Sequence, residues 1–117
     1  MTTRSATRCK ACDYSAFPFS FATNLCPMPL IRPSRDTDIA TITAIYAHHV
    51  LHGTGTFETT PPTEAEMATR RADVLSKGLP YLVVEHAGDV VGFAYGNWFK
   101  PRPAYRFSAE DSIYLAP

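Results

Sequence analysis

Two β-rich runs separated by four residues constrain the fold of this chain more than any other feature. The runs are Tyr81–Glu85 and Val90–Tyr95, and residues 86–89 between them read His-Ala-Gly-Asp. A short, glycine-containing connection between two such runs is typical of a β-hairpin. We therefore expect two antiparallel strands, the second of which extends to Phe99.

A helix precedes this hairpin and is marked at both ends. Thr63-x-x-Glu66 is a capping box, in which each side chain satisfies a free backbone N–H of the first helical turn. Gly78 follows the last turn and is expected to take a left-handed conformation there. The positions expected on the core face of this helix are Met67, Arg71, Val74 and Leu75.

An earlier helix is expected to begin near Ser34 or Asp36, because either side chain can cap a first turn. Residues 52–56 (His-Gly-Thr-Gly-Thr) end it, since glycine and threonine favour a loop. Steps of three and four place its apolar residues on one stripe, which comprises Ile39, Ile42, Ile45, Tyr46 and Val50.

Two short strands complete the order of elements. Leu30–Arg32 is the first strand, and Pro33 ends it because proline cannot donate a ladder hydrogen bond. Asp111–Leu115 is the last strand and follows a loop that contains two prolines. The order is a strand, two helices and three strands, which predicts an α/β or α+β fold with a largely antiparallel sheet.

Composition excludes several classes of protein. The chain has 117 residues, enough for one domain, and its eleven basic and eleven acidic residues give a net charge of zero. A general nucleic-acid surface needs a basic excess, so we expect no nucleic-acid partner. No apolar run approaches the roughly eighteen residues that span a bilayer, so we expect a soluble protein without a membrane partner.

The first 27 residues differ from the rest. They are rich in Ser and Thr and have no helical period, which indicates a disordered leader or a start codon assigned too early, with a transit peptide as an alternative. Cys9 and Cys12 form a C-x-x-C pair, but the second half of a zinc site is missing. All three cysteines lie before residue 27, so no disulfide framework is expected, and a cytoplasmic location follows.

Several segments in the same order resemble the phosphinothricin and methionine sulfoximine N-acetyltransferases of the GNAT superfamily. They are residues 45–52 (IYAHHVLH), Thr56-Phe57, Pro61-Pro62, residues 90–95 (VVGFAY) and residues 100–114 (KPRPAYRFSAEDSIY). The resemblance runs from about Leu30 to Pro117. It implies that residues 28–117 form the N-terminal part of a GNAT-like acetyltransferase domain.

Two departures from the family pattern stand out. Ala47 occupies a position where the family often has Asn. The family also continues past the fourth strand into a glycine-rich turn that binds the pyrophosphate of acetyl-CoA, whereas this chain ends at Pro117. The expectation is an N-acetyltransferase by family that is inactive as this chain alone, and the alternative is a truncated, non-catalytic remnant.

The resemblance assigns roles to residues near the last strand. Acetyl-CoA is the implied co-substrate and a small acidic amine the implied acceptor, while a homodimer remains open. Glu110, just before the fourth strand, is implied as the base that takes a proton from the acceptor amine. Lys100, Arg102 and Tyr105 are implied as substrate-binding residues, and Ile113, Tyr114 and Leu115 as a backbone site for acetyl-CoA.

Three histidines of the first helix raise the question of a metal. His48 and His52 lie one helical turn apart, with His49 between them. A metal site needs further ligands, and no carboxylate is placed to supply one. We therefore expect no metal, and the resemblance places His48 on the acceptor side of the cleft.

Overall fold

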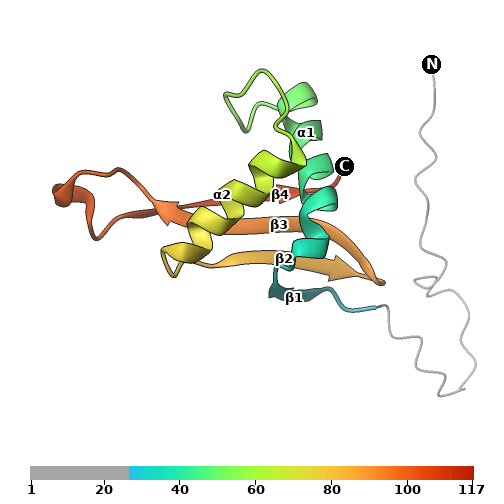
Figure 1. Ribbon diagram of the computed structural model, residues 1–117. Coiled ribbons are helices and arrows are strands. Elements are labelled where there is room, and N and C mark those ends of the chain that lie inside the picture. The colour runs from blue at the N-terminus through green and yellow to red at the C-terminus, as the bar shows by residue number, and fades with distance from the viewer. Residues whose placement is uncertain (1–26) are drawn as a thin grey trace, which may run out of the picture.

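The computed structural model describes residues 27–117, so the leader predicted for residues 1–27 and its cysteines lie outside the described residues apart from Pro27. The mixed α/β order expected from the sequence is confirmed (Figure 1). Strands β1, β2, β3 and β4 comprise Leu30–Pro33, Tyr81–His86, Asp89–Trp98 and Ala109–Leu115, and helices α1 and α2 comprise Ile39–His52 and Glu64–Ser76.

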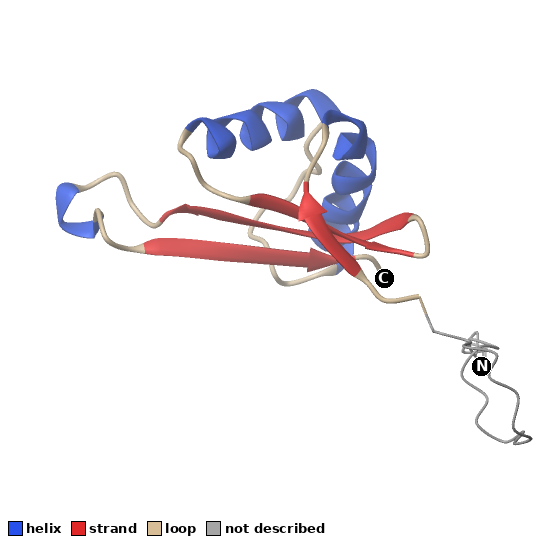
Figure 2. Ribbon diagram, turned by 90° about the horizontal axis from the view of Figure 1, so that it is seen from below, coloured by secondary structure: helices blue, strands red, loops and turns tan. Residues whose placement is uncertain are grey.

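The four strands form one antiparallel sheet in the order β1-β2-β3-β4. Both helices lie on the same face of this sheet, and the connection between β3 and β4 extends away from the body (Figures 1 and 2). The predicted hairpin between β2 and β3 is present. Its turn places Ala87 at φ 52° and Gly88 at φ 87°, the pair of left-handed residues that a two-residue hairpin turn requires.

The core lies between the sheet and the two helices. Ile42, Val83 and Phe93 are its largest fully buried side chains and come from α1, β2 and β3. The predicted stripe of α1 is confirmed, since Ile39, Ile42, Ile45 and Tyr46 are buried and Val50 packs against them. Apolar residues at helical spacing thus fix which side of α1 meets the sheet.

Helix α2 begins and ends as predicted. Thr63 accepts a hydrogen bond from the backbone N–H of Glu66 at 3.2 Å, and the Glu66 carboxylate accepts one from the backbone N–H of Thr63 at 2.7 Å. Gly78 has φ 72°. One predicted core position is wrong, because Leu75 is 42 % exposed. Val74, which was predicted with it, is buried, and the next residue lies about 100° further round the helix.

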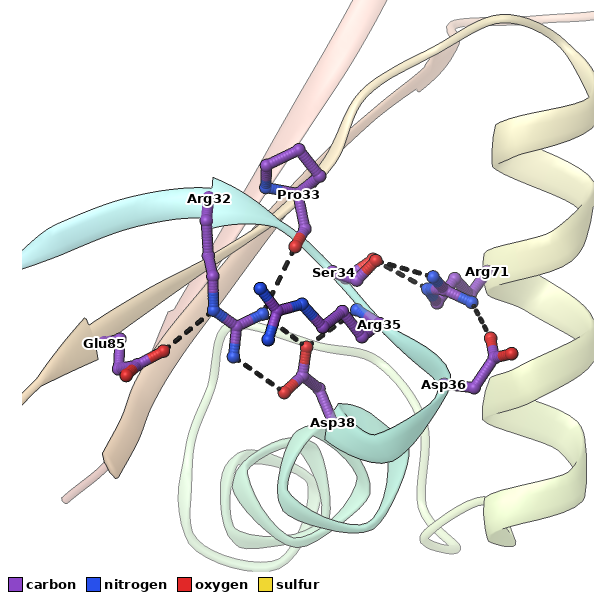
Figure 3. A network of polar contacts seen from close by, with 8 residues as sticks. All are labelled: Arg32, Pro33, Ser34, Arg35, Asp36, Asp38, Arg71 and Glu85. Carbon is purple, nitrogen blue, oxygen red and sulfur yellow. Dashed lines mark hydrogen bonds and ion pairs between the residues drawn. The ribbon is translucent and has the colours of Figure 1, made fainter. Parts of the chain in front are cut away.

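The start of α1 differs from the prediction, as neither Ser34 nor Asp36 caps it. A short 3-10 turn at Asp36–Asp38 precedes the helix, and Asp38 stands at the N-cap position without capping through its side chain. The buried Ser34 hydroxyl accepts a hydrogen bond from Arg71 Nε at 2.7 Å instead (Figure 3). Tertiary arginine contacts have replaced the local cap.

A buried carboxylate joins β1 to this turn. Arg32 donates to both oxygens of Asp38, at 2.8 and 3.0 Å, and to Glu85 of β2 at 2.8 Å (Figure 3). The Arg32 guanidinium holds the pKa of Asp38 below its ordinary value. Asp38 therefore contributes stability above the unfolded-state pKa of about 3.9, and this contribution is lost as the pH falls through the lower folded-state value.

Asp38→Asn is expected to lower the free energy of unfolding at pH 7 by about 1–3 kcal/mol, because charge-assisted bonds lose their anionic acceptor. Below about pH 4 the difference from the parent chain should shrink. Asp36→Asn is the matched control, since Asp36 pairs with Arg71 but its side chain is 96 % exposed. Urea titrations at several pH values measure both variants, and equal losses would contradict this role for Asp38.

The face of the sheet opposite the helices carries exposed apolar side chains. Ile31, Ile113 and Leu115 are 69 %, 66 % and 56 % exposed. None of the described residues covers this face, because both described helices pack on the other one (Figure 2). Neither of these helices is long and apolar enough to cross a membrane.

Candidate functional site

The site is organised by the register of β3 and β4. Asn97 pairs with Glu110, Tyr95 with Ser112 and Phe93 with Tyr114. Glu110 therefore lies inside β4, one residue after its start, and the prediction that it precedes the strand is wrong. Pairing with β3 has extended the strand by two residues beyond the β-rich run.

The side chain of Tyr114 identifies the face of β4 that points to the helices. Its ring lies 5.0 Å from the Tyr46 ring of α1 and 5.1 Å from the Phe93 ring, centroid to centroid. Because side chains alternate along a strand, Ser112 and Glu110 share this face. Glu110 is exposed, so its carboxylate is open to solvent on the helix side of the sheet.

A cavity of about 130 Å³ lies on the same side, between the sheet and the helices. Its lining is mixed, with a tyrosine of α1, two apolar and two charged residues of α2 and three residues of the sheet: Tyr46, Met67, Arg70, Asp73, Val74, Tyr81, Tyr95 and Asn97. Asn97 links the cavity to Glu110, since the two residues are direct partners on one face. Lys77 donates to Asn97 Oδ1 at 3.2 Å and to Asp73 at 2.7 Å.

Burial and neighbouring charges shift the pKa values of residues in and around the cavity. Burial raises the pKa of Tyr46 and of Tyr81, and it raises the pKa of Tyr114 to about 12. These hydroxyls therefore stay protonated and can donate hydrogen bonds at neutral pH. The Arg70 guanidinium lowers the pKa of Glu58, which keeps that carboxylate ionised.

The backbone of β4 presents a free edge among the described strands. Two hydrogen bonds, from Ala116 N to Val91 O and from Phe99 N to Ser108 O, set the alternation of the ladder. The backbone groups of Tyr114 therefore point to β3, while those of Ile113 and Leu115 point away from it. Of the three residues predicted to contact acetyl-CoA through backbone groups, only Ile113 and Leu115 present such groups at the edge.

The connection between β3 and β4 brings two of the three predicted substrate-binding residues together. Lys100 Nζ lies 5.1 Å from the Phe99 ring and 5.4 Å from the Tyr105 ring, in cation–π geometry. Arg102 is exposed and immediately precedes the 3-10 turn at Pro103–Tyr105. No hydrogen bond or ion pair in residues 27–117 joins this cluster to Glu110.

The histidines of α1 do not assemble a metal centre. The His48 and His52 rings are 4.9 Å apart, as their spacing predicts, whereas His49 Nε2 lies 2.7 Å from the Leu115 carbonyl oxygen. Within the described part of the chain no group of three or more His, Cys, Asp or Glu side chains could hold a metal ion.

Sequence reasoning missed the cavity and most of its lining. Arg70 follows the buried Met67 by three residues, so helical spacing could have placed it beside the core. Nothing local marks Tyr95 or Asn97 as cavity residues, because that depends on where α2 crosses the sheet.

Comparison with known proteins identifies the relatives of this chain. No family model matches it. It is 55 % identical over 87 residues to the phosphinothricin N-acetyltransferase of Alcaligenes faecalis, and this match covers 74 % of the chain and 44 % of the relative. It is 37 % identical over 89 residues to the L-methionine sulfoximine/L-methionine sulfone acetyltransferase of Salmonella typhimurium, covering 74 % and 51 %.

Solved structures agree with this relationship. The GNAT superfamily phosphinothricin acetyltransferase of Sinorhizobium meliloti, in complex with acetyl-CoA, superposes with a TM-score of 0.73 at 47 % identity. The match covers 76 % of the chain and 49 % of that structure, so the chain spans about half the length of the proteins it matches. The chain is therefore a homologue of the phosphinothricin N-acetyltransferases, with the fold of the GNAT superfamily over the span that it shares with them.

Proposed function

We propose that this chain forms part of an N-acetyltransferase that transfers acetyl from acetyl-CoA to the amino group of a small acidic amino-acid analogue. Its relatives are named for phosphinothricin and methionine sulfoximine, and one structure was solved with acetyl-CoA. The observation that carries the proposal is the position of Glu110, an exposed carboxylate on the helix-side face of β4, paired with the cavity residue Asn97. The proposed setting is the cytoplasm.

Glu110 is the proposed base. An amino group is mostly protonated at neutral pH and must lose a proton before its nitrogen can attack a carbonyl carbon. The nitrogen then forms a bond to the acetyl carbon, the carbon–sulfur bond breaks, and the thiolate leaves and takes up a proton. Acetyl-CoA supplies the activated acetyl group. The edge N–H groups of Ile113 and Leu115 fit a thioester carbonyl, because hydrogen-bond donors at that position stabilise developing negative charge.

Lys100, Arg102 and Tyr105 are the proposed contacts for the acidic groups of the acceptor. Arginine can hold an oxyanion with two parallel N–H bonds, while lysine acts as a point charge. The Lys100–Tyr105 contact supports the proposal, since it holds a cation and a hydroxyl-bearing ring side by side.

A second candidate is a non-catalytic remnant of such an enzyme. It is favoured by the exposed apolar face formed by Ile31, Ile113 and Leu115, which the described residues leave uncovered. We propose that turnover needs the whole domain and that these residues are inactive alone. The homodimer that the resemblance leaves open for the full-length enzyme is part of the same proposal.

The test uses a hybrid enzyme in which residues 30–117 replace the corresponding span of the Alcaligenes faecalis relative. Lys100→Ala and Arg102→Ala should each raise the KM for phosphinothricin by about tenfold and change kcat little, because each removes a charge-assisted contact. Arg106→Ala is the control, a cation of the same loop whose guanidinium packs on Phe107. An unchanged KM in both variants would contradict the proposed contacts.

A further inference from the structure

A carboxylate-binding site lies at the rim of the cavity and is filled by a residue of the chain itself. Arg70 donates to the two oxygens of Glu58 at 2.7 and 3.3 Å. The Tyr46 hydroxyl donates to the same carboxylate at 2.9 Å. Thr56 lies 3.1 Å from the Tyr46 hydroxyl, which gives that oxygen a second partner. A two-pronged arginine and a hydroxyl form an oriented set of donors for one carboxylate.

The donors and the carboxylate come from different parts of the fold. Tyr46 is only 5 % exposed and belongs to the core, and Arg70 projects from α2 with its guanidinium carbon 5.9 Å from the Tyr46 ring. Glu58 instead lies in residues 53–63, between the two helices, where the structure has neither helix nor strand. A tyrosine of the core and an arginine of α2 therefore hold a carboxylate that a loop supplies.

This carboxylate-binding site lies on the same cavity as the partner of the proposed base, Glu110. Tyr46 and Arg70 both line the cavity that reaches Asn97, the partner of Glu110. The Arg70 and Glu58 side chains are 46 % and 36 % exposed, so a ligand can approach the pair from solvent. A small acidic amine that entered this cavity would meet a carboxylate-binding site on its way to the proposed base.

We propose that Arg70 and the Tyr46 hydroxyl bind the carboxylate of the acceptor, and that Glu58 occupies this site until the acceptor displaces it. The inference rests on the proposed function and adds the residues that select a carboxylated acceptor. It leaves the phosphinate as the acidic group that Lys100 and Arg102 contact. The exchange is balanced, because an incoming carboxylate restores each hydrogen bond that Glu58 gives up. It also costs little, since ion pairs this exposed contribute weakly to stability.

Binding of two matched ligands to the full 117-residue chain tests the proposal. L-Phosphinothricin carries an amine, a phosphinate and a carboxylate, whereas 3-aminopropyl(methyl)phosphinic acid lacks only the carboxylate. Arg70→Gln should weaken phosphinothricin binding by about tenfold or more, because a charged hydrogen-bond pair is lost, and should leave the analogue unaffected. Glu58→Gln should strengthen phosphinothricin binding by about two- to fivefold, because a competing exposed ion pair is removed.

NMR titration up to about 10 mM ligand covers the weak affinities expected for so small a molecule. Arg35→Gln is the control for the loss of one positive charge, since the exposed Arg35 lies outside the cavity lining, and it should change neither affinity. Arg70→Lys keeps the positive charge and should retain part of the selectivity. It provides a second test in case Arg70→Gln does not fold.

Three results would overturn the proposal. They are an equal loss of affinity for the two ligands in Arg70→Gln, weaker phosphinothricin binding in Glu58→Gln, and no binding of phosphinothricin by the folded parent chain. Failure of the proposed function is distinguishable, because these titrations involve no acetyl transfer. A hybrid enzyme that acetylates the two amines equally well would retain the function without this site.

Discussion

Glu110→Gln is expected to lower kcat of the hybrid enzyme by about a hundredfold or more, the range typical for loss of a general base. Glutamine keeps the size and polarity of the side chain but cannot accept the proton from the acceptor amine. The side chain is exposed and makes no hydrogen bond within residues 27–117, so the substitution should leave the fold intact. Steady-state kinetics with saturating acetyl-CoA measures the effect.

Asp111→Asn is the matched control for this prediction. It removes a carboxylate from the next residue of β4, which points to the opposite face of the sheet. We expect kcat within about twofold of the parent value, because a solvated carboxylate on the far face has no role in proton transfer. Equal effects of the two substitutions, or an unchanged rate in Glu110→Gln, would remove Glu110 from the mechanism.

Phe93→Ala is expected to lower the free energy of unfolding by about 3–5 kcal/mol, through lost burial and the cavity that remains. Phe93 is 2 % exposed and lies at the centre of the sheet, where its ring stacks 6.0 Å from Tyr81 and 5.1 Å from Tyr114. Tyr114 and β4 depend on this contact, so the loss should also loosen the strand that carries Glu110. Urea denaturation followed by circular dichroism gives the magnitude.

The same substitution at an exposed site provides the comparison. Phe57 is fully exposed in the loop between α1 and α2, and Phe57→Ala should change stability by less than about 0.5 kcal/mol. A cost for Phe93→Ala no larger than that of Phe57→Ala would mean that the core between sheet and helices is not packed as described.

Features set by neighbouring residues were predictable from the sequence. The capping box of Thr63 and Glu66 and the left-handed Gly78 depend on a few consecutive residues, and both are present. The stripe of α1 is also local, because its period alone fixes which side is apolar. These signals predicted the order of elements and the class of fold.

Features set by distant contacts were not predictable. Ser34 has the chemistry of a cap, yet Arg71, 37 residues away, takes its hydroxyl. Glu110 was expected before the strand, but pairing with Asn97 extends β4 over it. The Arg70–Glu58 pair joins residues 12 apart across a loop, and no local rule selects that partner. The resemblance supplied the candidate residues, whereas the cavity lined by Asn97, the partner of Glu110, depends on how α2 packs on the sheet.

Acetyl transfer by the hybrid enzyme is the most direct test of the proposed function. Phosphinothricin is incubated with acetyl-CoA and the hybrid enzyme, the product is identified by mass spectrometry, and the free thiol released is counted. We predict one acetyl group on the amino nitrogen for each thiol released, at a rate that Glu110→Gln abolishes almost completely. A hybrid enzyme that folds and binds acetyl-CoA but leaves the amine unmodified would contradict the proposal that residues 30–117 carry an acetyltransferase site.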